Sequence, residues 1–462
     1  MNCGVCSIPF IYLGLLMGAS PRKKEPWKPV IQKVQKRLSM WKCKNLSFGG
    51  RCALLQSVLD AFPIYYLSFF KAPTGIISQL HSLFRSFLWG GNREKNKIAW
   101  VFFYDVCRYK KFGGLGVRDV GAFNLALLGK WRWRFLVEKE GLWHTMWWYD
   151  IWGIGSGIHV TSYWFSKGCV KEVGNGENTM FWDDVWYGSS ALSTRYARLY
   201  SISNNKSATL ADMCLRREGS VVWNWCWRRD LFQWEEDQLQ LLYLELQSVK
   251  LFEEKFDGWR WKHDSGGSYY DKSAYQVIIN QSIYADFSMY RYLWSKLIPS
   301  KVSSFGWRAI LDRIPTKQNL IKRKVLPSNV ASCVWCGLCE ETSSHLFFEC
   351  FYAFKLWMSC LQWFGFSSVQ NNTILANFEQ FVGVPNCNVV NRVRWSSIWL
   401  VTLWLIWLAR NEAVFCQKIM DPEDVVDLIK LRSWNWLRVK DLAFQYPFAL
   451  WSNNPFSCLN FS

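Results

Sequence analysis

Four potential metal ligands lie within eighteen residues of this 462-residue chain, and they constrain its folding more than any other feature. They follow the spacing Cys333-x2-Cys336-x8-His345-x4-Cys350. Structural Zn²⁺ takes four Cys or His ligands in a tetrahedron, and its binding energy becomes folding energy. We therefore predict a small module folded around Zn²⁺, with His345 and Cys350 on the helix that follows the Cys-x2-Cys pair. The apolar face of that helix is expected to carry Phe347, Phe351, Phe354 and Trp357. Three thiolates and one imidazole complete the coordination, so the ion would be structural and not catalytic.

Cys339 is a spare thiol next to this set, because Cys336-x2-Cys339 is a second Cys-x-x-Cys pair. We favour the pair Cys333 and Cys336 as ligands and leave exchange with Cys339 open. The alternative is chance clustering in a chain that contains 16 Cys. Sixteen cysteines in 462 residues are too few for a fold held together by disulfides. The thiols are therefore expected to be reduced, which indicates an intracellular protein.

Positive charge is concentrated near the N-terminus. The chain carries 55 Lys and Arg against 36 Asp and Glu, and residues 1–140 alone hold 23 basic and 7 acidic residues. Such a balance favours a polyanionic partner, either nucleic acid or an anionic membrane surface. Apolar residues recur at helical spacing over 27–44, which predicts a basic amphipathic helix. The basic face of this helix is a candidate for binding nucleic acid, and the alternative is an ordinary solvated face. The candidate binding residues are Lys28, Lys33, Lys36, Arg37, Lys44 and, just beyond the helix, Arg51.

The hydrophobic pattern predicts a mainly α protein with a small α+β connector. Four regions are expected: a basic, thumb-like helical region over 1–149, a mixed α/β connector over 150–285, the zinc module over 286–365, and a Trp-rich helical tail over 366–462. Gly49-Gly50 is expected to separate the first helix from the second. Further helices are predicted at 52–62, 76–89, 124–136, 235–256, 395–415 and 422–440.

Neither a signal peptide nor a transmembrane helix is expected. The apolar start of the chain precedes its first Lys and Arg residues, which is the wrong order for secretion. The longest uncharged apolar run elsewhere covers 395–409. At 15 residues it is shorter than the roughly 20 that a spanning helix needs. We expect an intracellular protein, with the nucleus as one open location, and no small-molecule substrate.

The sequence Phe181-Trp182-Asp183-Asp184 is similar to the aromatic-x-Asp-Asp turn that binds Mg²⁺ in polymerases. Two-metal catalysis needs a further carboxylate, and no apolar strand carrying an Asp precedes it at a comparable distance. We therefore interpret it as an exposed turn between aromatic strands.

Taken together, these segments resemble plant non-LTR (LINE-type) retrotransposon polyproteins, in the part downstream of the reverse transcriptase palm. The matching pieces are 8–14 (IPFIYLG), 27–29 (WKP), 46–51 (LSFGGR), 87–91 (FLWGG), 113–116 (GGLG), 124–131 (NLALLGKW), 181–186 (FWDDVW) and 272–275 (KSAY). Residues 293–350 resemble the reverse transcriptase zinc-binding domain, whose Glu-x3-His element falls on Glu341 and His345. The motif Trp404-x2-Trp407-x2-Arg410 is similar to the helix that usually precedes a ribonuclease H domain.

The resemblance implies a truncated polyprotein fragment, because the chain starts after the expected palm carboxylates and ends before those of ribonuclease H. We therefore expect non-specific binding of RNA or DNA without catalysis, with other element-encoded chains as further candidate partners. Two alternatives remain open. One is a residual RNA-directed DNA polymerase that uses Asp183 and Asp184. The other is a protein–protein interaction module built on the zinc module and the Trp-rich tail.

Overall fold

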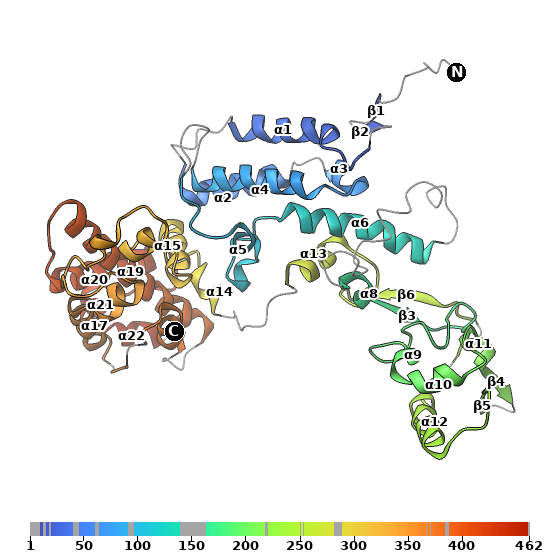
Figure 1. Cartoon of the computed structure of the whole chain (residues 1–462). Helices are drawn as coiled ribbons and strands as arrows, with labels where there is room; N and C mark the ends of the chain where they lie inside the picture. The colour runs from blue at the N-terminus through green and yellow to red at the C-terminus, as the bar shows by residue number, and fades with distance from the viewer. Residues whose placement is uncertain are drawn as a thin grey trace. The chain divides into compact units, whose positions relative to one another are not determined.

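The computed structural model is mainly helical, and the strands among its described residues form three antiparallel pairs, β1–β2, β3–β6 and β4–β5 (Figure 1). The predicted fold class is confirmed. The chain forms two compact units, which are described separately below. The four-region division stays a prediction. The structure describes residues 10–12, 15–17, 20–39, 46–60, 64–90, 97–138, 163–217, 220–249, 251–252, 254–280, 289–365, 367–369, 371–383 and 388–460.

The first unit combines Met1–Pro26, Pro63–Thr74 and Val120–Gln281. Its elements are β1 (Phe10–Tyr12), β2 (Leu15–Met17), α3 (Ile64–Phe69), α6 (Val120–Val137), α8 (Trp164–Gly168), β3 (Cys169–Glu172), α9 (Leu192–Arg195), α10 (Ala197–Ile202), α11 (Leu210–Met213), β4 (Cys214–Arg217), β5 (Ser220–Trp223), α12 (Gln233–Leu246), β6 (Gly258–Trp261) and α13 (Asp271–Asn280). The helix α12 is shorter than the predicted 235–256.

Helix α6 is the scaffold of one half of this unit. It packs against α13 and α3, and the Tyr269 hydroxyl donates a hydrogen bond of 2.7 Å to the Ala126 carbonyl. The buried Asn124 side chain donates to the carbonyls of Leu67 and Phe70 at 2.7 and 2.8 Å. Because a buried amide must find partners, these bonds fix the chain that leaves α3 against α6.

The other half of the unit contains the mixed strand and helix segment around an aromatic core. The carboxylate of Asp257 accepts four hydrogen bonds from the loop over residues 174–179 and so holds that loop closed. The donors are the backbone N–H groups of Gly174 (2.7 Å), Gly176 (2.9 Å) and Asn178 (2.9 Å) and the hydroxyl of Thr179 (2.8 Å). Burial alone raises the pKa of Asp257, but these hydrogen bonds outweigh it and hold that pKa below its ordinary value.

The second unit combines Trp27–Phe62, Gly75–Asp119 and Ser282–Ser462. Its helices are α1 (Lys28–Ser39), α2 (Phe48–Asp60), α4 (Thr74–Trp89), α5 (Phe103–Cys107), α14 (Tyr290–Leu293), α15 (Ser300–Ile310), α16 (Lys317–Lys322), the π-helical turn η6 (His345–Glu349), α17 (Phe351–Phe364), α18 (Ile374–Gly383), α19 (Val389–Phe415), α20 (Pro422–Lys440), α21 (Phe448–Asn453) and α22 (Pro455–Asn460), with short 3₁₀ turns at Lys110–Phe112 and Ser328–Val330. A further 3₁₀ turn, Glu25–Trp27, spans the sequence boundary between the two units.

The helix α2 begins earlier than predicted, because Gly49 and Gly50 lie inside its first turn and do not separate two helices. A Cβ atom on Gly49 would lie 3.2 Å from the Ser300 Oγ atom. The glycine therefore permits close packing of α2 against α15, a contact between residues about 250 positions apart. The expectation of a break was wrong at this point, since the reason for the glycine is tertiary.

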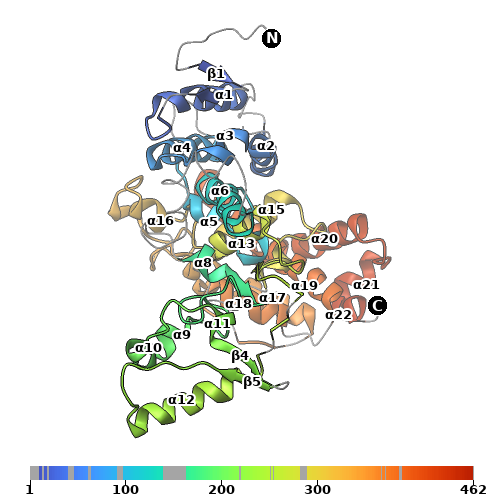
Figure 2. The ribbon, with the colours of Figure 1, turned by 90° about the vertical axis from the view of Figure 1, so that its right-hand side faces the viewer.

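The helix α19 forms the centre of the second unit, and α15, α18 and α20 pack around it. Figures 1 and 2 both show it among the neighbouring helices of the C-terminal part. By length and composition it could cross a membrane, but 67% of its apolar window is buried inside the protein. Trp395, Ile398 and Trp399 are completely buried. This burial is consistent with the core helix of a soluble protein.

Candidate metal centre

A tight turn brings Cys333 and Cys336 together. A bridge pairs Ser332 with Glu340, and the Cys333 N–H donates to the Cys339 carbonyl at 2.8 Å. Inside this small hairpin the Gly337 N–H donates to the Cys333 carbonyl at 3.0 Å. Gly337 has a φ of +65°, which an L side chain rarely adopts. The turn therefore depends on glycine directly after the second sulfur.

His345 and Cys350 do not lie on one continuous α-helix as predicted. His345 begins the π-helical turn η6, and Cys350 has extended backbone angles (φ −64°, ψ 136°) that interrupt the helix before α17. The Cys350 N–H donates to the His345 carbonyl at 2.8 Å. On a regular α-helix, residues five apart point in directions about 140° apart. The π-helical turn and the break bring both side chains to one side.

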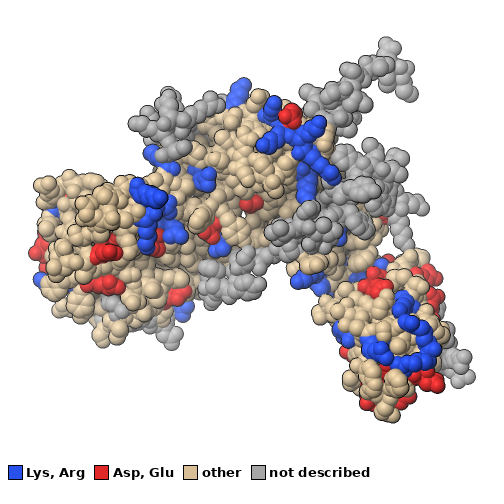
Figure 3. Space-filling view, in the orientation of Figure 1, with Lys and Arg blue, Asp and Glu red and all other residues tan. Residues whose placement is uncertain are grey.

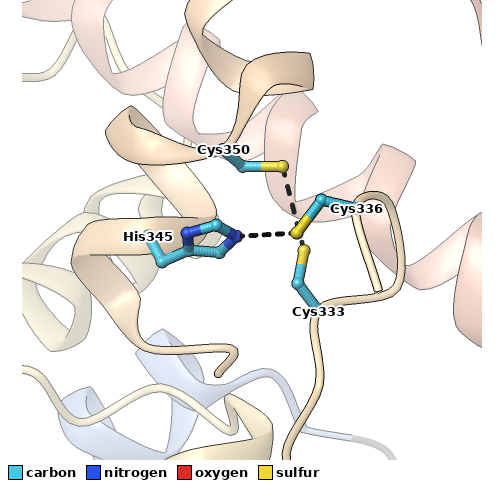
Figure 4. Close-up of side chains that lie close together, drawn as sticks. All are labelled: Cys333, Cys336, His345 and Cys350. Carbon is cyan, nitrogen blue, oxygen red and sulfur yellow. Dashed lines mark hydrogen bonds between the residues drawn. The ribbon is translucent and has the colours of Figure 1, made fainter. Parts of the chain in front are cut away.

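The four ligand candidates converge as the spacing predicts (Figure 4). Their donor atoms all lie within 4.8 Å of one another. The sulfurs of Cys333 and Cys350 are 3.9 Å apart, and the Cys336 sulfur is 3.3 Å from the His345 Nε2 atom. A tetrahedron with Zn–S bonds of about 2.3 Å has sulfur–sulfur edges of about 3.8 Å. The arrangement therefore fits one tetrahedral ion with three sulfur ligands and one nitrogen ligand.

The thiols of Cys333 and Cys350 influence each other in opposite directions. A hydrogen bond from Cys350 lowers the pKa of Cys333, and backbone N–H groups of Cys336 and Trp335 lower it further. The same shared proton raises the pKa of Cys350.

The aromatic pair Trp335 and Tyr352 covers the cluster. Their rings stack with centroids 4.2 Å apart and an interplanar angle of 20°. The Tyr352 hydroxyl donates a 2.9 Å hydrogen bond to the Met420 carbonyl, which links the start of α17 to the segment before α20. This packing limits movement of the two ligand-bearing segments.

A buried ion pair anchors the same segment to α19. Arg410 contacts both carboxylate oxygens of Glu341, at 2.6 and 3.2 Å, and the two side chains are 4% and 0% exposed. Glu341 also accepts the Lys317 N–H at 2.9 Å. The motifs that contain Glu341 and Arg410 do not predict this contact, because the two residues are 69 positions apart. A charged residue directly after the apolar run of α19 was the available signal, since buried charges are usually paired.

The surroundings of the predicted site agree with expectation at Cys339 and differ from it at two phenylalanines. Cys339 is exposed and its sulfur is not among the converging atoms, so the geometry favours Cys333 as the partner of Cys336. Phe351 and Phe354 were expected on a buried face with Phe347 but are 69% and 46% exposed. The interruption at Cys350 changes the helical phase after Phe347, and this moves both rings to the outer side of α17.

The basic face of α1 is present as predicted, since Val30, Ile31, Val34 and Leu38 are buried and the basic residues of the helix are exposed. Figure 3 shows Lys and Arg gathered on the surface over α1. Arg51 instead donates hydrogen bonds of 2.8 Å to the carbonyls of Leu46 and Leu88. Lys44 lies outside the described residues. The exposed basic residues of α1 are Lys28, Lys33, Lys36 and Arg37.

The Phe-Trp-Asp-Asp segment is a turn, but its aromatic rings are not exposed. Phe181 and Trp182 are completely buried, whereas Asp183 is exposed and Asp184 accepts the Met180 N–H at 2.9 Å. Of the residues that the structure describes, Asp183 and Asp184 belong to no group of three or more side chains that could share a metal ion.

Comparison with known proteins agrees with this geometry. A family model described as zinc-binding in reverse transcriptase matches residues 269–357, which include all four converging side chains. An "uncharacterized mitochondrial protein" of Arabidopsis thaliana is 30% identical over 142 residues, covering 27% of this chain and 92% of that relative. The chain belongs to a plant retrotransposon-derived family with a reverse transcriptase zinc-binding domain. A second Arabidopsis relative, named "putative ribonuclease H protein", is 26% identical over 425 residues. That match covers 85% of this chain, which spans 64% of the relative's length.

Proposed function

We propose that this chain is a nucleic-acid-binding part of a LINE-type reverse transcriptase, with Zn²⁺ held as a structural ion and without chemistry of its own. The observation that carries the proposal is the basic face of α1 in a family defined by a reverse transcriptase zinc-binding domain. Its free cysteines among the described residues suit a reducing, intracellular compartment.

The geometry of α1 supports binding along a phosphate backbone. Its apolar residues form one buried stripe, and its basic side chains spread over the opposite face. The helix carries four basic residues and no acidic residue. Cations spread along one helix face neutralise phosphates whatever the bases are, so we propose binding that is largely independent of sequence.

The proposed zinc site would hold the Cys/His segment in one conformation. Cys333, Cys336, His345 and Cys350 would bind the ion and fill its coordination shell, which leaves no position for substrate or water. The ion would supply folding energy and no catalytic step.

Salt dependence tests the proposal. Each phosphate contact releases counterions, so log K falls with log salt by about 0.9 per contact on duplex. Changing Lys28, Lys33, Lys36 and Arg37 together to Gln should reduce this slope by about 3.6. The measurement is fluorescence anisotropy of a labelled RNA–DNA duplex between 50 and 300 mM salt.

A matched control removes the same charge elsewhere in the unit, from the exposed side chains Lys355, Lys418, Arg432 and Lys440. The proposal predicts a slope close to that of the unmodified chain for this control. Equal slopes for the α1 variant, the control and the unmodified chain would contradict the assignment of α1.

A further inference from the structure

Three exposed arginines lie close together in the first unit, far along the sequence from α1. Arg198 on α10 and the consecutive Arg228 and Arg229 before α12 are exposed. The Arg228 N–H donates to the Ile202 carbonyl at 3.0 Å, and its guanidinium donates to the Ser201 carbonyl. These contacts place the end of α10 beside the segment that precedes α12. Figure 3 shows a band of Lys and Arg on this part of the surface.

A single buried carboxylate orders two of the three arginines. The Arg198 Nε atom lies 2.8 Å from Glu235 Oε1, and Arg229 contacts both oxygens of Glu235 at 2.8 and 2.9 Å. Glu235 is 0% exposed and also accepts the Phe232 N–H. The hydrogen bond from Arg229 is the main reason that the pKa of Glu235 falls to about 2. At neutral pH this one carboxylate therefore faces two guanidinium groups, and Arg228 adds a third positive charge. The exposed carboxylates of Asp230, Glu236 and Asp237 belong to the same segment, so the arginines form a local cationic group and not a uniformly basic surface.

Two half-exposed aromatic rings lie against these guanidinium groups. Trp234 is 49% exposed with the Arg198 guanidinium 5.6 Å from its ring centroid. Phe232 is 56% exposed with the Arg229 guanidinium 4.2 Å from its centroid. The core of this region is formed by other residues, including Phe181 and Trp182. Core filling therefore does not explain a tryptophan and a phenylalanine at the surface.

A purely structural role explains part of this cluster. Glu235 caps the first turn of α12, and Arg229 neutralises it. That role requires neither Arg228 nor the exposed ring of Trp234. Ordered cations beside exposed aromatic rings are the elements with which proteins bind single strands, because each base offers a face for stacking and each phosphate a negative charge.

We propose that Arg198, Arg228, Arg229, Phe232 and Trp234 form a site for single-stranded nucleic acid, in which guanidinium groups contact phosphates and an unstacked base lies on Trp234. The proposal rests on the nucleic-acid binding proposed above and adds a second, strand-specific site to it. A duplex keeps its bases stacked inside, so Trp234 gains nothing from it. RNA and DNA single strands share this chemistry.

Two variants test the site without leaving Glu235 unpaired. Trp234→Leu removes the stacking face but keeps an apolar side chain, and Arg228→Gln removes a charge that does not contact Glu235. Leu244→Ala, at an exposed position on the same helix, and Lys272→Gln, at an exposed position on α13, serve as controls. The full chain is titrated against labelled 12-nucleotide oligo(U), oligo(dT) and a hairpin duplex with the same number of phosphates, and circular dichroism checks folding.

Trp234→Leu should weaken single-strand binding roughly five-fold or more and leave duplex binding within about two-fold. Arg228→Gln should lower the single-strand salt slope by about 0.7. Single-strand affinity unchanged in a folded Trp234→Leu variant, or an equal loss on the duplex, would overturn the proposal. If the unmodified chain bound neither form, both proposals would fail. If only the α1 variant changed the salt slope, the single-strand site alone would fail.

Discussion

Replacing Glu341 by Gln tests how strongly the Cys/His segment depends on the buried ion pair that joins it to α19. Gln keeps the shape of the side chain and one carbonyl acceptor, so the Lys317 N–H keeps a partner. The positive charge of Arg410, only 4% exposed, then loses its counter-ion. Removing one member of a buried pair typically costs about 3–5 kcal/mol, because the other charge stays buried without compensation.

That cost is large compared with the roughly 5–15 kcal/mol by which folded domains are stable. With a shift in Tm of about 2–4 °C per kcal/mol for a domain of 150–250 residues, Glu341→Gln should lower Tm by at least about 6 °C. Differential scanning calorimetry of the full chain measures this directly. The neighbouring Glu340→Gln is the matched control, since Glu340 is exposed and contacts Gln318 at 3.3 Å. It should change stability by no more than about 0.5 kcal/mol.

A double variant separates the pair from its surroundings. Arg410→Met combined with Glu341→Gln removes both charges, so it should be less destabilised than the sum of the two single variants. The ion pair does not anchor the segment if Glu341→Gln melts like the unmodified chain. The same conclusion holds if the stability changes of the two single variants add up to that of the double variant.

Three further outcomes follow from the described contacts. Cys350→Ser should lose bound zinc and unfold the Cys/His module, whereas Cys339→Ser should keep one zinc per chain; elemental analysis and thermal melting compare the two, and equal zinc content would contradict the ligand set. Because hydrogen bonds hold the pKa of Asp257 below its unfolded value, its contribution is present above about pH 4 and lost as the pH falls through the folded pKa. Asp257→Asn should therefore flatten the acid side of the stability profile in urea unfolding from pH 3 to 7, and an unchanged profile would contradict this. Gly306→Ala would place a Cβ atom against the Leu400 side chain and should cost about 1–3 kcal/mol, so an unchanged Tm would show that α15 and α19 have room to adjust.

Features set by neighbours in the sequence could be predicted from it. The basic stripe of α1 depends on a 3.6-residue period, and its apolar residues are buried as that period indicates. The convergence of Cys333, Cys336, His345 and Cys350 also depends on short spacings, which leave little freedom once a turn and a helix form. The start of α4 and its end at Gly90, with a φ of +74°, follow from equally local signals.

Features set by distant contacts were not predictable in the same way. Gly49 belongs to a helix because α15 packs against it, and no local pattern reveals that. The interruption at Cys350 replaces a regular helix because only an irregular backbone brings a His and a Cys five residues apart to one side. The partners of Glu341 and Glu235 are likewise tertiary: Arg410 lies 69 residues from Glu341, and Arg198 lies 37 residues from Glu235.

We propose that one divalent ion joins the two halves of the Cys/His module. Native mass spectrometry of the freshly purified full chain weighs the bound ion. We expect an added mass of about 65 Da per chain, lost together with folding when a chelator is added. A folded chain at the mass of the bare polypeptide, with all four candidate ligands intact, would contradict it.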